Sequence, residues 1–154
     1  MKNTFLNLIH HLFIVNFIYY GHIILISLLK VNSKALPVIE LLVAIALYTT
    51  FSYCFLKYEK NTKKKVITFS LIPIISLVFF LITLIAFRPG INSLSSDAVW
   101  TPFLIFNGFI LPLIETSNIG NILIGIVIAF IPAVCSFIGM ELQCLKKIKN
   151  TVSK

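Results

Sequence analysis

The chain has 154 residues, of which 58% are hydrophobic and only 12% are charged, and its mean hydropathy is +1.00. Soluble domains use about 45–50% apolar and about 25% charged residues, so this composition excludes an ordinary soluble protein. The formal net charge is +8, from 13 Lys and Arg against 5 Asp and Glu. These bases lie almost entirely outside the apolar runs and only Arg88 is an arginine, so we interpret the charge as a topology signal and predict no nucleic-acid partner.

Four apolar runs are long enough to cross a bilayer, since a transmembrane helix needs about 20 apolar residues. The sequence therefore predicts an all-α integral membrane protein, a single polytopic domain over 1–154, with membrane helices at 5–29, 36–56, 66–87 and 119–140. The first run is too long for the apolar core of a signal peptide and no small-residue cleavage site follows it, so we expect it to be retained. Pro37 suits the first turn of the second helix, where its missing N–H would be unpaired anyway.

Two basic segments and one polar loop separate or follow these helices. The stretch "KYEKNTKKK" over 57–65 is the strongest local charge signal, and 141–154 is a second basic segment. The loop 88–118 begins with "RPG", which is typical of a turn. Lysines near a membrane surface attract anionic lipid, although retention of the loops on the cytoplasmic side explains them equally well.

The distribution of basic residues predicts the orientation, because cytoplasmic loops carry an excess of Lys and Arg. Four helices and a cytoplasmic N-terminus put ten basic residues inside and only Lys30, Lys34 and Arg88 outside. The inverted protein would reverse those numbers. We therefore predict a plasma-membrane protein with both termini, 57–65 and 141–154 in the cytoplasm and 88–118 outside it. The abundance of Lys, Ile, Asn and Phe suggests an AT-rich bacterial genome.

The apolar segment 98–114 is the least regular element. Its 17 residues contain Pro102 and Pro112 and are short for a membrane span. A fifth span here would place six basic residues inside and seven outside, which removes the charge asymmetry. We therefore predict an extracytoplasmic helix at 98–114 that either lies at the interface or re-enters the membrane.

Aromatic residues are expected at the two membrane surfaces, where their amphipathic rings suit the headgroup level. Tyr48, Tyr53 and Tyr58 cluster toward the predicted inner end of the second helix, and Trp100 lies near the predicted outer surface.

All three histidines, His10, His11 and His22, lie in the first predicted helix. His11 and His22 share a face, about 20° apart around the axis, but are separated by about 16 Å along it, too far for one metal ion. We expect neutral histidines that hydrogen-bond to neighbouring helices or sit at the interface, and we predict no metal and no cofactor. Two alternatives stay open: haem ligation shared between two copies, and a proton-linked role for His22, the one histidine placed well inside the hydrocarbon.

The outer side of the predicted bundle holds a group of charged candidates for a functional polar site. They are Glu40, Arg88, Asp97 and Glu115, to which His11 and His22 are added from the first helix. Arg88 with Asp97 or Glu40 forms a plausible ion pair, which is either a solvated surface pair or the floor of an external pocket. No acidic residue is predicted near the middle of the membrane, which argues against an ion-driven pump built on carboxylates.

The last helix carries a ridge of small residues at spacings of three or four: Gly125, Ala129, Ala133, Ser136 and Gly139. Such ridges let helix backbones approach closely. The ridge therefore predicts close packing, either inside the bundle or in a homodimer.

No nucleophile–base pair, metal-binding motif or phosphate loop is present, and the three cysteines form no C-x-x-C. We therefore predict a non-enzymatic accessory, regulatory or immunity-type protein whose partners are the lipid bilayer and another membrane protein or a second copy. A small homo-oligomeric transporter or channel is the first alternative. A haem or redox protein using the histidines of the first helix is the second.

Overall fold

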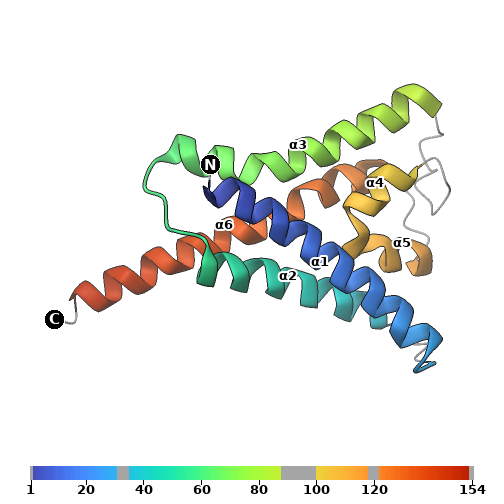
Figure 1. The fold of residues 1–154 in the computed structure, drawn as a ribbon, viewed down its shortest axis with the longest axis horizontal. Helices are drawn as coiled ribbons and strands as arrows, with labels where there is room; N and C mark the ends of the chain where they lie inside the picture. Colours follow the sequence, from blue (N-terminus) through green and yellow to red (C-terminus); the bar gives the residue numbers. More distant parts are fainter. Residues whose placement is uncertain (1, 31–34, 88–99, 118–121, 153–154) are drawn as a thin grey trace.

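The computed structural model describes residues 2–30, 35–87, 100–117 and 122–152, with side chains over 2–30, 35–86, 100–114 and 126–146. Every regular element in these ranges is helical (Figure 1). The elements are α1 (Lys2–Ser27), α2 (Leu36–Phe55), α3 (Thr62–Phe87), α4 (Thr101–Phe106), the 3₁₀ helix η2 (Gly108–Ile110), α5 (Leu111–Ser117) and α6 (Ile122–Val152).

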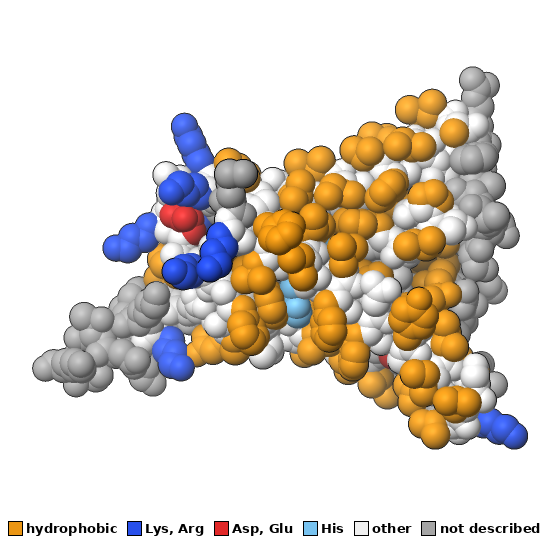
Figure 2. Space-filling model, viewed as in Figure 1, with side chains coloured by type: hydrophobic (Ala, Val, Ile, Leu, Met, Phe, Trp, Pro, Cys, Tyr) orange, Lys and Arg blue, Asp and Glu red, His pale blue; other side chains and the backbone are white. Residues whose placement is uncertain are grey.

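Four of these helices, α1, α2, α3 and α6, are long and apolar enough to cross a membrane, as the sequence predicts. They run along the long axis of the molecule, and both chain termini lie at the same end (Figure 1). Apolar side chains cover the flank of this bundle, whereas most basic side chains gather at the end that holds the termini (Figure 2).

The observed ends differ from the predicted ones mainly at α6. This helix continues to Val152, twelve residues past the predicted end at Met140, so most of 141–154 is helical. The extension follows from composition, because Leu, Gln, Lys and Glu are good helix formers whether or not they face lipid. Pro37 lies in the first turn of α2 as expected, and α3 and α6 continue through Pro73 and Pro132.

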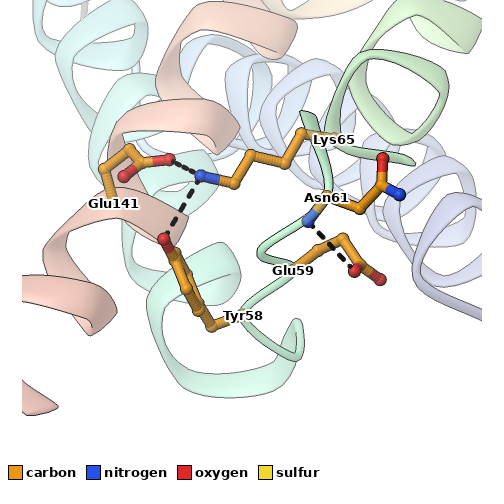
Figure 3. A network of polar contacts seen from close by, with 5 residues as sticks. All are labelled: Tyr58, Glu59, Asn61, Lys65 and Glu141. Atoms are coloured by element: carbon orange, nitrogen blue, oxygen red, sulfur yellow. Dashed lines mark hydrogen bonds and ion pairs between the residues drawn. The ribbon is translucent and has the colours of Figure 1, made fainter. Parts of the chain in front are cut away.

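Polar side chains tie the helices together at the end where the termini lie. Lys65 of α3 forms an ion pair with Glu141 of α6, and its Nζ also donates to the Tyr58 hydroxyl at 3.4 Å (Figure 3). The amide of Gln143 in α6 donates to the Tyr53 carbonyl and, at 2.8 Å, to the Leu56 carbonyl. Since the last carbonyls of a helix have no intrahelical partner, Gln143 caps α2 with a side chain from α6.

Residues 100–117 form an interrupted helical segment of α4, η2 and α5, where the sequence predicts an irregular helix at 98–114. Pro102 lies in the first turn of α4, where proline is tolerated. Asn107 separates α4 from η2, and Pro112 is the second residue of α5. Proline and glycine close to this break account for three short elements in place of one.

The interrupted segment packs between the long helices. The Trp100 and Phe103 rings lie 5.4 and 5.3 Å from the Phe80 ring of α3, measured between centroids. Gly108 lies so close to α1 that a Cβ atom on it would be 3.1 Å from Cγ1 of Val15. Trp100 is only 1% exposed, so its ring does not face the surroundings of the bundle. Its indole packs in the aromatic core instead.

Candidate functional site

A buried pair of hydrogen-bonded side chains, His22 and Glu40, joins α1 to α2. Nδ1 of His22 lies 2.9 and 3.0 Å from the two carboxylate oxygens of Glu40, and both residues are less than 10% exposed. His22 is five residues from the end of α1, and Glu40 is four residues into α2, so the pair lies near the end opposite the termini. Because a carboxylate only accepts, Nδ1 of His22 carries the proton and donates. The structure therefore brings together two of the predicted candidates.

His11 makes a second polar contact, close to the middle of α1. Its Nε2 lies 2.9 Å from the Phe106 carbonyl oxygen, and its Nδ1 lies 2.7 Å from the Tyr48 hydroxyl. A carbonyl can only accept, so Nε2 donates, and a neutral ring then accepts the Tyr48 hydroxyl proton at Nδ1. Both ring nitrogens are occupied in this way, which joins α1 to α2 and to the end of α4.

Two of these side chains are fully enclosed by the bundle. His11 and Tyr48 are both 0% exposed, so neither ring faces the surroundings of the bundle. His10 is also buried, although it lies on another part of the helix surface, and its ring stacks on Phe51 at a centroid distance of 3.4 Å. The cause is the same for all three: each ring packs against a neighbouring helix.

Asn107, at the break in the interrupted segment, reaches the middle of α3. Its side-chain Nδ2 donates to the Ser76 hydroxyl at 2.8 Å and to the Phe103 carbonyl at 2.9 Å, and the Ser76 hydroxyl lies 3.1 Å from Oδ1. Both side chains are fully buried. Asn107 and His11 therefore form a buried polar layer at one level of the bundle, to which the interrupted segment contributes Phe106 and Asn107.

The predicted outer charge cluster is only partly visible. Arg88 and Asp97 lie outside the described residues. Glu115 is in α5, but only its backbone is described. Glu40 has His22 as its partner, and this pair was not among the pairings predicted from sequence.

The small-residue ridge of α6 faces the inside of the bundle where its side chains are described. Ala129 and Ser136 are fully buried and Ala133 is partly buried. A Cβ atom on Gly139 would lie 2.2 Å from the Thr49 carbonyl oxygen, so α2 and α6 are in backbone contact there. Gly125 is in the same helix, outside the part whose side chains are described. Between Ala129 and Gly139 the ridge is thus covered by this chain itself and is not free for a homodimer.

A cavity of about 410 Å³ lies between α1 and the α4–η2 segment. Four of its lining residues carry polar groups and are exposed at the side of the bundle: Asn16, Tyr19, Tyr20 and Thr101. Asn16 lies next to the centre of α1, and its Nδ2 donates to the Leu12 carbonyl of its own helix at 2.7 Å. No hydrogen bond from the described residues reaches its Oδ1, which leaves an acceptor on the flank of an apolar bundle.

Sequence reasoning missed the contact of Tyr48 with His11, although a signal for it exists. Buried residues recur every fourth position along α2, at Glu40, Ala44, Tyr48 and Ser52. In a helix that is apolar all round, polar and small residues on one stripe mark the face that packs against other helices. Asn16 lies off the equivalent buried stripe of α1.

No group of three or more His, Cys, Asp or Glu residues that could hold a metal ion occurs within the described part of the chain. His10 and His11 are consecutive and His22 lies further along α1, and each hydrogen-bonds to a different residue of α2: Leu47, Tyr48 and Glu40 respectively. No protein-family model, no curated protein and no solved structure matches this chain.

Proposed function

We propose that this multi-pass membrane protein is an accessory protein, of a regulatory or immunity type, that binds a transmembrane helix of another membrane protein. The observation that carries this proposal is the position of Asn16. It lies next to the centre of α1, it is exposed, and it borders the cavity between α1 and α4–η2.

An exposed amide at this depth needs a partner. Hydrocarbon offers no hydrogen bond, so Oδ1 of Asn16 would be left unsatisfied in lipid even though Nδ2 donates to the Leu12 carbonyl. Asn side chains join membrane helices by hydrogen bonds that contribute about 0.6–2 kcal/mol. The hydroxyls of Tyr19, Tyr20 and Thr101 border the same cavity and extend the polar surface toward the end opposite the termini. A helix carrying small and polar residues fits such a groove.

In the topology that accompanies this function, the protein lies in the plasma membrane and both of its termini are in the cytoplasm. The basic side chains gathered at the end with the termini support it (Figure 2). The segment 98–114 then enters the membrane from the outer side and turns back at Asn107. The contacts of Phe106 and Asn107 with His11 and Ser76 support re-entry over a position at the interface.

The test is site-specific photo-crosslinking in the native membrane. A photoreactive amino acid at Tyr20 (59% exposed) should form a crosslink to one membrane protein, and the same amino acid at Leu42 of α2 (also 59% exposed) should not. Asn16→Leu should weaken the complex about threefold to thirtyfold, the range expected for one interhelical hydrogen bond. Thr50→Leu, which replaces an exposed polar residue of α2, is the matched control and should leave the complex intact.

Two results would contradict the proposal. Equal crosslinking from residues 20 and 42 would mean that the groove has no special role. A crosslinked product containing only two copies of this chain would favour the homo-oligomeric alternative.

That alternative, a small transporter or channel, has one observation in its favour. Transport sites are often formed by interrupted helices near the bilayer centre. The break at Asn107 contacts the middle of α3, and the Phe106 carbonyl contacts His11. Solute flux into liposomes that contain the purified protein, lost on Asn107→Ala, would support this function. Flux that is unchanged by Asn107→Ala would count against it.

A further inference from the structure

A second cavity, of about 440 Å³, lies at the end of the bundle where α1 and α3 begin and α2 ends. Its walls include the three lysines Lys2, Lys57 and Lys64 and one acidic residue, Glu59. Basic side chains surround acidic ones at this end of the molecule, next to the apolar flank (Figure 2). We name this cavity, defined by these four residues, the basic pocket.

Hydrogen bonds fix the backbone positions of two of these lysines. The Asn3 side chain donates to the Lys57 carbonyl at 2.7 Å and accepts from the Lys57 N–H at 3.2 Å. Oδ1 of Asn61 accepts from the Lys63 and Lys64 N–H groups at 2.9 and 3.3 Å and caps the start of α3. One wall of the pocket is therefore held by a contact between the start of α1 and the end of α2, and another by a local cap at the start of α3.

The pocket carries an excess of positive charge. Among the described residues the ion pairs are His22–Glu40 and Lys65–Glu141, so Lys2, Lys57 and Lys64 each lack one. The carboxylate of Glu59 accepts from the Asn61 N–H at 3.4 Å. Three ammonium groups against one carboxylate favour an anionic ligand.

The apolar surface begins directly beside these charges. Ile67 lines the basic pocket and is 61% exposed, and Val66, which precedes it in α3, is 60% exposed. Phe5 of α1, which follows the pocket residue Thr4, is 66% exposed. A ligand in the pocket thus meets ammonium groups at one end and an apolar flank at the other. Basic pockets at the ends of membrane helices bind anionic lipid headgroups. We propose that the basic pocket binds the phosphate group of an anionic phospholipid whose acyl chains lie along the apolar flanks of α1 and α3 that follow their first turns.

Native mass spectrometry of the full-length protein in detergent tests this proposal. The probes are phosphatidylglycerol, phosphatidylcholine with the same acyl chains, and glycerol phosphate as a soluble phosphate ester. The pocket variant is Lys2→Gln/Lys57→Gln/Lys64→Gln. The control variant is Lys60→Gln/Lys63→Gln/Lys146→Gln, which removes the same charge from lysines that do not line this cavity.

The wild-type protein should bind phosphatidylglycerol more tightly than either other probe. The pocket variant should lose at least about tenfold in this affinity, because each basic residue near the surface contributes about fivefold. The control variant should lose less than about twofold. The single change Glu59→Gln should increase the affinity for phosphatidylglycerol. It removes a negative charge that repels the lipid phosphate, while every lysine of the pocket stays in place.

Three results would overturn the proposal. Equal losses in the two triple variants would mean that only the general charge of this end attracts lipid. Glycerol phosphate bound as tightly as phosphatidylglycerol would assign the pocket to a soluble phosphate. An unchanged affinity in Glu59→Gln would mean that the lipid does not bind in this pocket. This outcome can be read even if the triple variant fails to fold.

Discussion

The Asn107 amide and the Ser76 hydroxyl make two hydrogen-bonding contacts, 2.8 and 3.1 Å long, between the break of the interrupted segment and the middle of α3. Without this contact the fully buried Asn107 amide would keep its hydrogen bond to the Phe103 carbonyl, but its Oδ1 would lose the Ser76 hydroxyl as a partner. The contact therefore explains how a discontinuous helix is tolerated among long ones. It also makes the role of each side chain measurable.

Removal of the Ser76 hydroxyl should destabilise the fold slightly. In Ser76→Ala, Asn107 keeps its hydrogen bond to the Phe103 carbonyl, so we expect a loss of about 1 kcal/mol. Asn107→Ala removes the hydrogen bonds to both Ser76 and the Phe103 carbonyl, and it should lower the free energy of unfolding by about 2 kcal/mol. Unfolding in mixed micelles, followed by the fluorescence of the buried Trp100, measures both. Ser27→Ala, at the exposed end of α1, should be neutral.

The contact between α2 and α6 predicts opposite effects for two glycines. Gly139→Ala places a methyl group 2.2 Å from the Thr49 carbonyl oxygen, so the helices must separate, at a cost of about 3 kcal/mol. At Gly21 no atom lies within 4 Å of the added Cβ, and alanine is the better helix former. Gly21→Ala should therefore be neutral or stabilise by up to about 1 kcal/mol. A comparison of the two unfolding midpoints checks this, and similar midpoints would contradict the packing.

Loss of Glu40 should be more harmful than loss of both partners of its ion pair. Glu40→Leu leaves Nδ1 of His22 buried without an acceptor, and removing one partner of a buried pair costs about 3–5 kcal/mol. His22→Leu/Glu40→Leu should cost clearly less than the sum of the two single variants. A double-mutant cycle of unfolding free energies gives the coupling. Additive effects would mean that the pair contributes nothing beyond its separate residues.

The proposed topology predicts opposite labelling of two sites. In a variant whose cysteines Cys54, Cys135 and Cys144 are replaced, Leu29→Cys should react with a membrane-impermeant maleimide in intact cells. Leu29 lies beyond the end of α1 opposite the N-terminus and is 63% exposed. Lys60→Cys, in the loop between α2 and α3, should react only after the cells are opened. The reverse pattern would invert the orientation argued from the basic residues.

Much of the architecture followed from local properties of the sequence. The length of each apolar run determines which segments can cross a membrane, and the predicted spans match α1, α2 and α3 to within four residues at each end. Pro102 and Pro112 marked 98–114 as irregular, because proline interrupts helical hydrogen bonding. Both signals come from residues close together in the chain and need no knowledge of their neighbours in space.

Only the tertiary structure decided which side chains meet. Helices that are apolar all round carry little periodicity to show which face turns inward, so Tyr48 and Trp100 could be assigned equally well to a surface belt and to the core. The partner of Glu40 depends on how α1 crosses α2, and the inward direction of Gly139 depends on the backbone contact with Thr49. Such contacts join residues far apart in the sequence. Their physical basis is close packing and hydrogen bonding between helices, and composition alone does not specify either one.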